Sequence, residues 1–475
     1  MEHRKAWIVA VVSALVAALG GCGGGASAGE TVPVVVGYQS RTINTVTAGT
    51  LLRSLGYFEK RLAELGARTG KKYTVTWRDY DTGAPITAQM IAGKIDIGSM
   101  GDYPMLINGS RTQKLSDNRT EMVSVTGYNA RGALNMVVVA PNSTATSLVD
   151  LKGQKVSTSV GSAAHGTLVH ALSDAGLNPV TDVRTENQQP SVGASALQAG
   201  GVAALSQFVA WPGQLVFAGQ AKPLYDGGAL NVPTLHGVVV RRGFAAEQPD
   251  VLDAFLSAQL DATRHLWAHP LAAAESVARD TGLPPEVVYL YNGRNGMVTF
   301  DATVKSEQRA ALRGDLPFLK SIGNLDDLDV GSFVDDGALR RVYGGSYDAD
   351  TRRTDNQARI GGADPVCQRP VTDPATAGET WLAGEEDTHP SATPTCLLRF
   401  VKSAQAGGKR MRAAYVPDAL TGTRWFADHA VRVTDPAAGP DTHLLPFTTE
   451  ANARRYLAAH PGATELDYPT ALAQA

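Results

Sequence analysis

Cysteine and net charge are both scarce in this chain. Among 475 residues there are 3 cysteines, and the formal net charge at pH 7 is -3. So few cysteines exclude a small scaffold held together by disulfides, and the near-neutral charge gives no basic field to attract nucleic acid. The length and the ordinary hydrophobic content of 43% allow two or three domains with sizeable cores. We therefore expect a multidomain globular protein that does not bind nucleic acid.

Hydrophobic runs long enough to span a bilayer are also missing. The longest apolar stretch, Ala6 to Leu19, follows a His-Arg-Lys cluster and is too short for a comfortable membrane span. It ends in LGGC, which is similar to the lipobox of bacterial lipoproteins. The similarity implies a signal peptide over residues 1–21, acylation of Cys22, and a flexible tether over residues 22–30 that holds the protein outside the cytoplasm at the membrane. A secretory peptide that merely contains a cysteine is the alternative.

Short β-branched runs alternate with helical periodicity through the first two thirds of the chain. TVPVVVGY at residues 31–38 is typical of a strand, and GTLLRSLGYFEKRLAEL after it has apolar residues at helical spacing. The order β-α-β-α-β follows, and a second block from about residue 134 repeats the alternation. This predicts an α/β protein with mostly parallel sheets covered by helices. The long helical stretch after residue 248 indicates two lobes, with the chain crossing from one to the other and back.

The composition changes after residue 343. Residues 344–362, GGSYDADTRRTDNQARIGG, contain almost no apolar side chain and are typical of a linker. Residues 363–475 hold two of the cysteines and combine short strands with helices. We expect a two-lobed α/β domain over residues 31–343, a linker over 344–362, and a small α+β domain over 363–475.

Small and hydroxyl-bearing residues fill the loops after the predicted strands. Four such loops are YQSRTINT, YDTGAPIT, GSMGDYPM and SVGSAAHG, each placed where a strand ends and a helix begins. Open α/β sheets bind ligands at the carboxyl ends of their strands, and helix N-termini there offer unpaired N–H groups and partial positive charge. The pattern favours capture of a small anion in one cleft.

Longer signatures occur between about Thr31 and Tyr343, among them AGKIDIGSMGDYPML, VGSAAHGTLVHALSDAGL and FVAWPGQL. Together they resemble the substrate-binding proteins of ABC importers for aliphatic sulfonates, taurine and nitrate. The resemblance implies a two-lobed periplasmic-binding-protein fold of type II that closes on a small anion and delivers it to an ABC permease, with no catalysis and no cofactor. The ligand-binding residues that it implies are Gln39, Ser40, Thr82, Gly83, Gly101, Asp102, Tyr103, Gly161, Ser162, His165 and Trp211.

Three of these residues leave alternatives open. Asp102 would repel an anion unless it is paired or serves an amine such as that of taurine. Ser162 and His165, one helical turn apart, could be ligand donors, a helix cap with a packed histidine, or a nucleophile with its base. The segment VGSAAHG does not have the G-x-S-x-G pattern, and no acidic residue is marked to orient His165, so ligand binding is the favoured interpretation.

The third unit carries a signature of its own. YVPDALTGTRWFADHAVRV and PFTTEANARRYL follow the segments around Cys367 and Cys396 in an order that resembles the NosL family, the copper-binding accessory lipoproteins of nitrous oxide reductase. That family uses methionines near the cysteines for Cu(I), whereas Arg369 and Leu397 stand at those positions here. A disulfide between Cys367 and Cys396 is the favoured expectation in an oxidising compartment. A residual Cu(I) site is the alternative, and it would make the protein a copper-handling lipoprotein.

Overall fold

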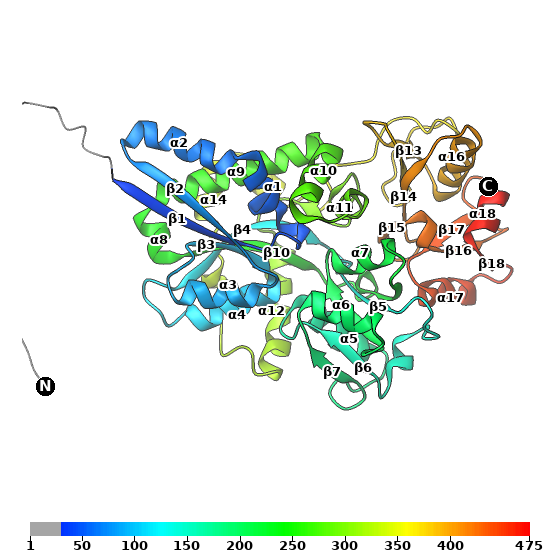
Figure 1. The fold of residues 1–475 in the computed structure, drawn as a ribbon, viewed down its shortest axis with the longest axis horizontal. Helices are drawn as coiled ribbons and strands as arrows, with labels where there is room; N and C mark the ends of the chain where they lie inside the picture. The colour runs from blue at the N-terminus through cyan, green and yellow to red at the C-terminus, as the bar shows by residue number, and fades with distance from the viewer. Residues whose placement is uncertain (1–29) are drawn as a thin grey trace, which may run out of the picture.

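The computed structural model describes residues 30–475, so the expected signal peptide, Cys22 and all but the last residue of the expected tether lie outside the described residues. Figure 1 shows two α/β lobes and, at the C-terminal end, a third unit that lies beside both. None of the helices in the described part of the chain is both long enough and apolar enough to cross a membrane.

The first lobe is built on a six-stranded sheet. Its strands are β1 (Thr31–Tyr38), β2 (Lys72–Asp79), β3 (Ile97–Gly101), β4 (Thr120–Asn129), β10 (Thr234–Arg241) and β11 (Thr299–Phe300). The order is β11-β4-β10-β3-β1-β2, in which β1 is parallel to β2 and β3, while β10 is antiparallel to β3 and β4. Three of the five strand pairings are thus antiparallel, against the prediction of mostly parallel sheets, because β4 and β10 carry the chain out of the lobe and back.

Helices cover both faces of this sheet. One hydrophobic cluster contains Phe58 and Phe255, and the cluster on the other face contains Met105 and Phe318. The single helix expected after β1 is divided at Gly56, which has a left-handed φ of 65°. The helices of the lobe and of the segment that follows it are η1 (Ile43–Ala48), α1 (Thr50–Leu55), α2 (Tyr57–Thr69), α3 (Gly83–Ile91), α4 (Asp102–Thr112), α8 (Arg242–Glu247), α9 (Pro249–Ala268), α10 (Pro270–Thr281), α11 (Pro285–Asn292), α12 (Ser306–Ser321), α13 (Val330–Phe333), α14 (Gly337–Tyr343) and α15 (Tyr347–Asp350).

The second lobe has a five-stranded sheet. Its strands are β5 (Asn135–Val139), β6 (Lys155–Thr158), β7 (Arg184–Asn187), β8 (Ala204–Phe208) and β9 (Lys222–Asp226), in the order β7-β6-β8-β5-β9. Its helices are η2 (Leu148–Leu151), α5 (Ala163–Asp174), α6 (Pro190–Gln198), α7 (Trp211–Phe217) and η3 (Gly227–Ala229). Residues 130–134 and 227–233 connect the two lobes, so the chain crosses between them twice.

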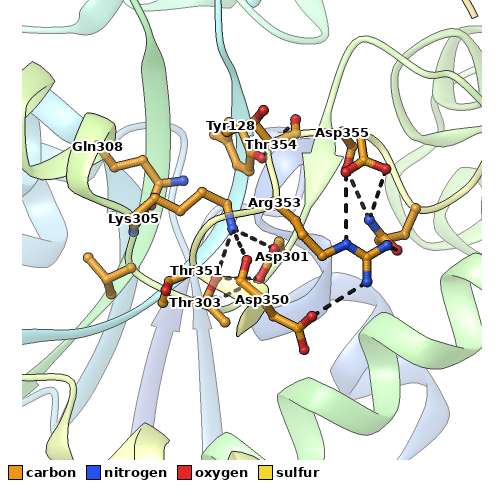
Figure 2. A network of polar contacts seen from close by, with 12 residues as sticks. Tyr128, Asp301, Thr303, Lys305, Gln308, Asp350, Thr351, Arg353, Thr354 and Asp355 are labelled. Carbon is orange, nitrogen blue, oxygen red and sulfur yellow. Dashed lines mark hydrogen bonds and ion pairs between the residues drawn. The ribbon is translucent and has the colours of Figure 1, made fainter. Parts of the chain in front are cut away.

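Residues 344–362 lie against the first lobe. Their main anchor is the buried ammonium of Lys305, which is 2.8 Å from a carboxylate oxygen of Asp301 and donates to the carbonyl of Asp350 at 3.0 Å (Figure 2). The Tyr128 hydroxyl donates to a carbonyl of the same segment at 3.1 Å. Because a buried charge requires such partners, the network ties this polar segment to the lobe.

The third unit is a small α+β body. Its strands form the sheets β13-β12-β14-β15 and β17-β16-β18, with bounds β12 (Gly378–Leu382), β13 (His389–Ser391), β14 (Met411–Pro417), β15 (Arg424–Phe426), β16 (Val431–Thr434), β17 (Leu444–Phe447) and β18 (Thr464–Leu466). Its helices are α16 (Pro394–Ala406), η4 (Ala427–His429), α17 (Glu450–Ala459) and α18 (Tyr468–Gln474). Cys367 and Cys396 form a disulfide, with an S–S distance of 2.00 Å, that ties the segment before β12 to α16.

Candidate functional site

A cavity of about 180 Å³ lies between the two lobes. The first lobe contributes the ends of β1, β2 and β3 with the loops that follow, and the second lobe contributes those of β6, β7 and β8. These are the carboxyl ends of the strands, as the α/β pattern predicts. Among the described residues, none of the side chains that line the cavity belongs to Asp, Glu, Lys or Arg. Any charged ligand would therefore be held by neutral groups.

Four helices begin at this cavity, and their N-terminal residues line it. The N-cap residues Thr82 of α3 and Gln189 of α6 make no capping hydrogen bond through their side chains, and Gly101 has no side chain to cap α4, where the Tyr103 N–H donates to the Asp102 carboxylate at 2.8 Å. The first-turn N–H groups of a helix have no partner within the helix, and each N-terminus carries about half a positive charge. The arrangement offers backbone donors to an anion from both lobes, since α3 and α4 belong to the first and α6 to the second.

Ser162 is the N-cap of α5 and lines the cavity. Its Oγ accepts the backbone N–H of His165 at 3.3 Å, which leaves its own proton free to donate to a ligand. The preceding Gly161, with φ of 84°, has a backbone conformation that a side chain would disfavour. Ser162 can therefore cap the helix and bind a ligand at the same time.

The His165 ring does not line this cavity. Its Nδ1 accepts the N–H of Gly161 at 3.3 Å, and the ring packs edge-on against Phe318 with centroids 5.4 Å apart. Burial lowers the pKa of His165 to about 4, so the imidazole is neutral. Because His165 receives no hydrogen bond from the Ser162 hydroxyl, the geometry is that of a capped helix with a packed histidine and does not resemble a nucleophile with its base.

His236 on β10 is a cavity residue that the sequence analysis missed. Its side chain is buried beside Gly101, where a Cβ would lie 3.0 Å from Nε2. The Asn44 amide nitrogen lies 2.6 Å from Nδ1, and with the amide in this orientation Nδ1 accepts and Nε2 carries the proton. Burial lowers the pKa of His236 to about 3. The ring is thus a neutral donor in the cavity wall.

Asp102 and Tyr103 point away from this cavity and line a smaller one beside the interlobe crossovers. The Asp102 carboxylate accepts the Thr234 hydroxyl at 2.8 Å and the Leu235 N–H at 3.1 Å, both at the start of β10. Burial raises the pKa of Asp102 from its ordinary value. The repulsion expected between Asp102 and an anion is thereby avoided, because the carboxylate bonds to the returning strand instead of facing the cavity.

Two further expected residues lie outside the cavity lining. Ser40 donates its hydroxyl and its N–H to Asp79, at 2.6 and 2.8 Å. Trp211 packs under the Arg41 guanidinium, which is 5.4 Å from the ring centroid and comes from the opposite lobe. The structure brings together Gln39, Thr82, Gly83, Gly101, Gly161 and Ser162, and it adds Ser159, Asn187, Gln189, Phe208 and His236.

The disulfide of the third unit lies next to a carboxylate. Oxygens of Asp364 lie within 4.8 Å of both sulfur atoms. That carboxylate accepts backbone N–H groups of Val366, Cys367 and Ala392 at 2.7 to 2.9 Å. Its hydrogen bonds hold the loop that carries Cys367.

Known proteins similar to this chain were found by sequence and by structure. The model of the NMT1-like family matches residues 29–279. The taurine-binding periplasmic protein of Escherichia coli is 29% identical over 220 residues, which cover 44% of this chain and 65% of that protein. The alkanesulfonate-binding protein SsuA of Xanthomonas axonopodis pv. citri, solved bound to MOPS, gives a TM-score of 0.53 at 22% identity and covers 65% of this chain and 99% of its own.

A second solved structure gives the same result for the fold. The periplasmic aliphatic sulphonate binding protein SsuA of Escherichia coli gives a TM-score of 0.50 at 23% identity, covering 63% of this chain and 96% of its own. The similarity in fold shows that the chain contains the two-lobed α/β periplasmic-binding-protein fold.

Proposed function

The chain belongs to the NMT1-like family, and from this premise we propose that it is the extracytoplasmic solute-binding component of an ABC importer. It captures a small anion of the sulfonate, taurine or nitrate class between its lobes and delivers the anion to a membrane permease. The observation that carries the proposal is the convergence of four helix N-termini on one neutral interlobe cavity. Anions bind such positions because unpaired N–H groups and helix dipoles both favour negative charge.

The chemistry of the walls supports a compact ligand with an oxyanion at one end. The Ser162 hydroxyl and the His236 Nε2–H add side-chain donors to the backbone N–H groups. Phe208 and Pro104 provide an apolar surface for a short aliphatic tail. A sulfonate with a short carbon chain satisfies both parts of the wall. Turnover is not part of the proposal, since the Ser162 hydroxyl lacks a hydrogen-bonded base.

The anchoring at the membrane belongs to the same proposal. The taurine-binding relative is periplasmic by its name, and the LGGC sequence that ends at Cys22 would attach this chain to the outer face of the membrane by a lipid. An anchored binding protein stays close to its permease.

Thermal unfolding of the mature protein with single candidate ligands tests the function. We expect taurine or ethanesulfonate to raise the melting temperature, because a ligand at 100 times its Kd stabilises the folded state by about 2.7 kcal/mol. Nitrate and bicarbonate test the inorganic alternatives. Ethanolamine, which has the amine and carbon chain of taurine but no sulfonate, is the matched control and should cause no shift. Stabilisation by ethanolamine equal to that by taurine would contradict anion capture.

Copper handling by the third unit is the second candidate. The cluster of Asp364, Cys367 and Cys396 favours it, since thiolates bind Cu(I) once they are reduced. Titration of the reduced full-length protein with Cu(I) against a chelator competitor, beside a Cys367→Ser/Cys396→Ser variant, tests it. Equal copper uptake by the two proteins would dispose of this candidate.

A further inference from the structure

The third unit packs against α11, a helix next to the first lobe (Figure 1). The Tyr289 hydroxyl donates to the buried Glu379 carboxylate at 2.9 Å. Arg412 donates to Glu286 at 2.7 Å, and the Tyr415 hydroxyl donates to the carbonyl of the same residue at 2.9 Å. This side of the unit is therefore fixed by buried aromatic and charged contacts.

The first lobe in turn holds α11. The Asn292 side chain donates to the carbonyl of Ile43 in η1 at 3.0 Å, and α11 packs on α10, which packs on α1. The same helix also packs on α7 of the second lobe, where the Gly213 N–H donates to the Tyr291 hydroxyl at 3.1 Å and both helices contribute to one hydrophobic cluster. The third unit thus packs on α11, a helix that the first lobe holds in place.

The opposite side of the unit contacts the second lobe through the buried Asp226 and through Phe426, whose ring packs on Phe217 of α7 with centroids 5.2 Å apart. Asp226 is the last residue of β9 and lies directly before the crossover that returns to the first lobe. Its side chain is buried, with 1% exposed. The hydroxyls of Thr421 and Thr423 each donate to its Oδ2 at 2.7 Å. A partly exposed ion pair, Lys222 with Glu450 at 3.3 Å, lies on the same side.

We infer that Thr421 and Thr423 are positioning residues for the ligand cleft, because they hold the second lobe, through Asp226, at a fixed angle to the first. The inference rests on the proposed function, since the cavity lies between the lobes that this contact fixes. Two-lobed binding proteins close by rotation at the segments that join the lobes. Here rotation of the second lobe at residues 130–134 and 227–233 would strain its contacts with the third unit at Asp226 and at Phe217, because that unit is also held on α11. The fusion of the third unit thereby restrains opening and closing of the cleft.

Distances between spin labels on the two lobes test this inference without any ligand. Labels at Glu64→Cys on α2 and Val180→Cys on the second lobe are both at exposed positions, and Cys22→Ser in the full-length chain prevents labelling there. We expect one narrow distance distribution in the parent protein. Thr421→Val/Thr423→Val should broaden or shift it by several Å. Thr421→Ser/Thr423→Ser keeps the hydroxyls and should restore the narrow distribution.

Thr395→Val is the matched control for stability. The Thr395 hydroxyl is buried and accepts the N–H of Leu444 inside the third unit, so this variant loses a hydrogen bond of the unit without touching either lobe. It should leave the distance distribution narrow. If the double valine variant does not fold, Thr421→Val and Thr423→Val each remove one of the two hydrogen bonds to Asp226, and each should broaden the distribution.

Two results would overturn the inference. One is a broad distribution in the parent protein, and the other is a double valine variant, or a pair of single valine variants where the double does not fold, that matches the parent. Neither result bears on anion binding, which the ligand panel tests separately. A narrow parent distribution that broadens only in the interface variants supports the inference even if no anion of the panel binds.

Discussion

Replacing Ser162 by aspartate separates the two roles of this residue. Aspartate caps helices about as well as serine, and its charge is favourable at a helix N-terminus by about 0.3–1 kcal/mol. Its carboxylate can accept the His165 N–H that the serine hydroxyl now accepts at 3.3 Å. We therefore expect the free energy of unfolding of Ser162→Asp to stay within about 1 kcal/mol of the parent value.

The same substitution should abolish anion binding. A carboxylate at about 4 Å from the ligand anion costs about 4 kcal/mol at the effective dielectric constant of a partly buried site, which corresponds to a roughly thousandfold loss of affinity. Ser162→Gly retains most of the capping and loses only the hydroxyl donor, so it should weaken binding by about fivefold, or about 1 kcal/mol.

Isothermal titration with the anion identified by the ligand panel, together with urea unfolding, measures both effects. Ser173→Asp is the matched control, because Ser173 is an exposed serine near the far end of the same helix. It should bind the anion like the parent. If Ser162→Asp bound the anion with parental affinity, the assignment of the α5 N-terminus to the ligand site would be refuted.

Three other predictions concern groups on which the fold depends. His236 has its pKa lowered from 6.5 to about 3, so it stabilises the protein above pH 6.5 and this contribution is lost as the pH falls. At about pH 5 the loss in unfolding free energy is about 2 kcal/mol. In His236→Asn the unfolding free energy should therefore fall less between about pH 6.5 and pH 4 than in the parent. A fall as steep as in the parent would contradict this. Lys305→Met leaves the Asp301 carboxylate buried without its ammonium and should cost about 3–5 kcal/mol in urea unfolding, whereas an unchanged midpoint would show that the network does not stabilise the lobe. Cys367→Ser/Cys396→Ser removes a disulfide between residues 29 apart and should destabilise the third unit by about 3–4 kcal/mol. Tryptophan fluorescence in urea measures this loss. Equal stability of the reduced and the oxidised parent protein would argue against it.

Local pattern predicted where several elements lie. The β-branched run TVPVVVGY predicts a strand at the residues that form β1, Thr31–Tyr38, whereas the single helix expected after it is divided at Gly56. The direction of the strands was less predictable, since β10 pairs antiparallel with β3 from far along the chain. Periodicity records which face of an element is apolar, and it contains no information on which distant strand lies beside it.

The same limit explains which site residues were predicted. Thr82 and Ser162 follow their strands directly, so the rule on strand ends places them in the cleft. His236 enters the cavity from β10, because that strand lies beside β3 and its ring faces Gly101. Asp102 was expected in the cavity wall, but its carboxylate turns to the N–H of Leu235, a partner that only the crossover brings near.

On the proposed function, the division of donors between the lobes would serve release of the anion as well as its capture. Helices α3 and α4 begin in the first lobe and α5 and α6 in the second, so neither lobe alone surrounds an anion with all four N-termini. Each N-terminus contributes only about half a charge, and the lining contains no fixed cation that would keep the anion bound when the lobes separate. On the proposed function, a permease that pulls the lobes apart would remove half of the backbone donors at once. A lysine or arginine in the wall would bind the anion more tightly but would retain it in the open state, and a neutral wall built from two halves avoids that retention.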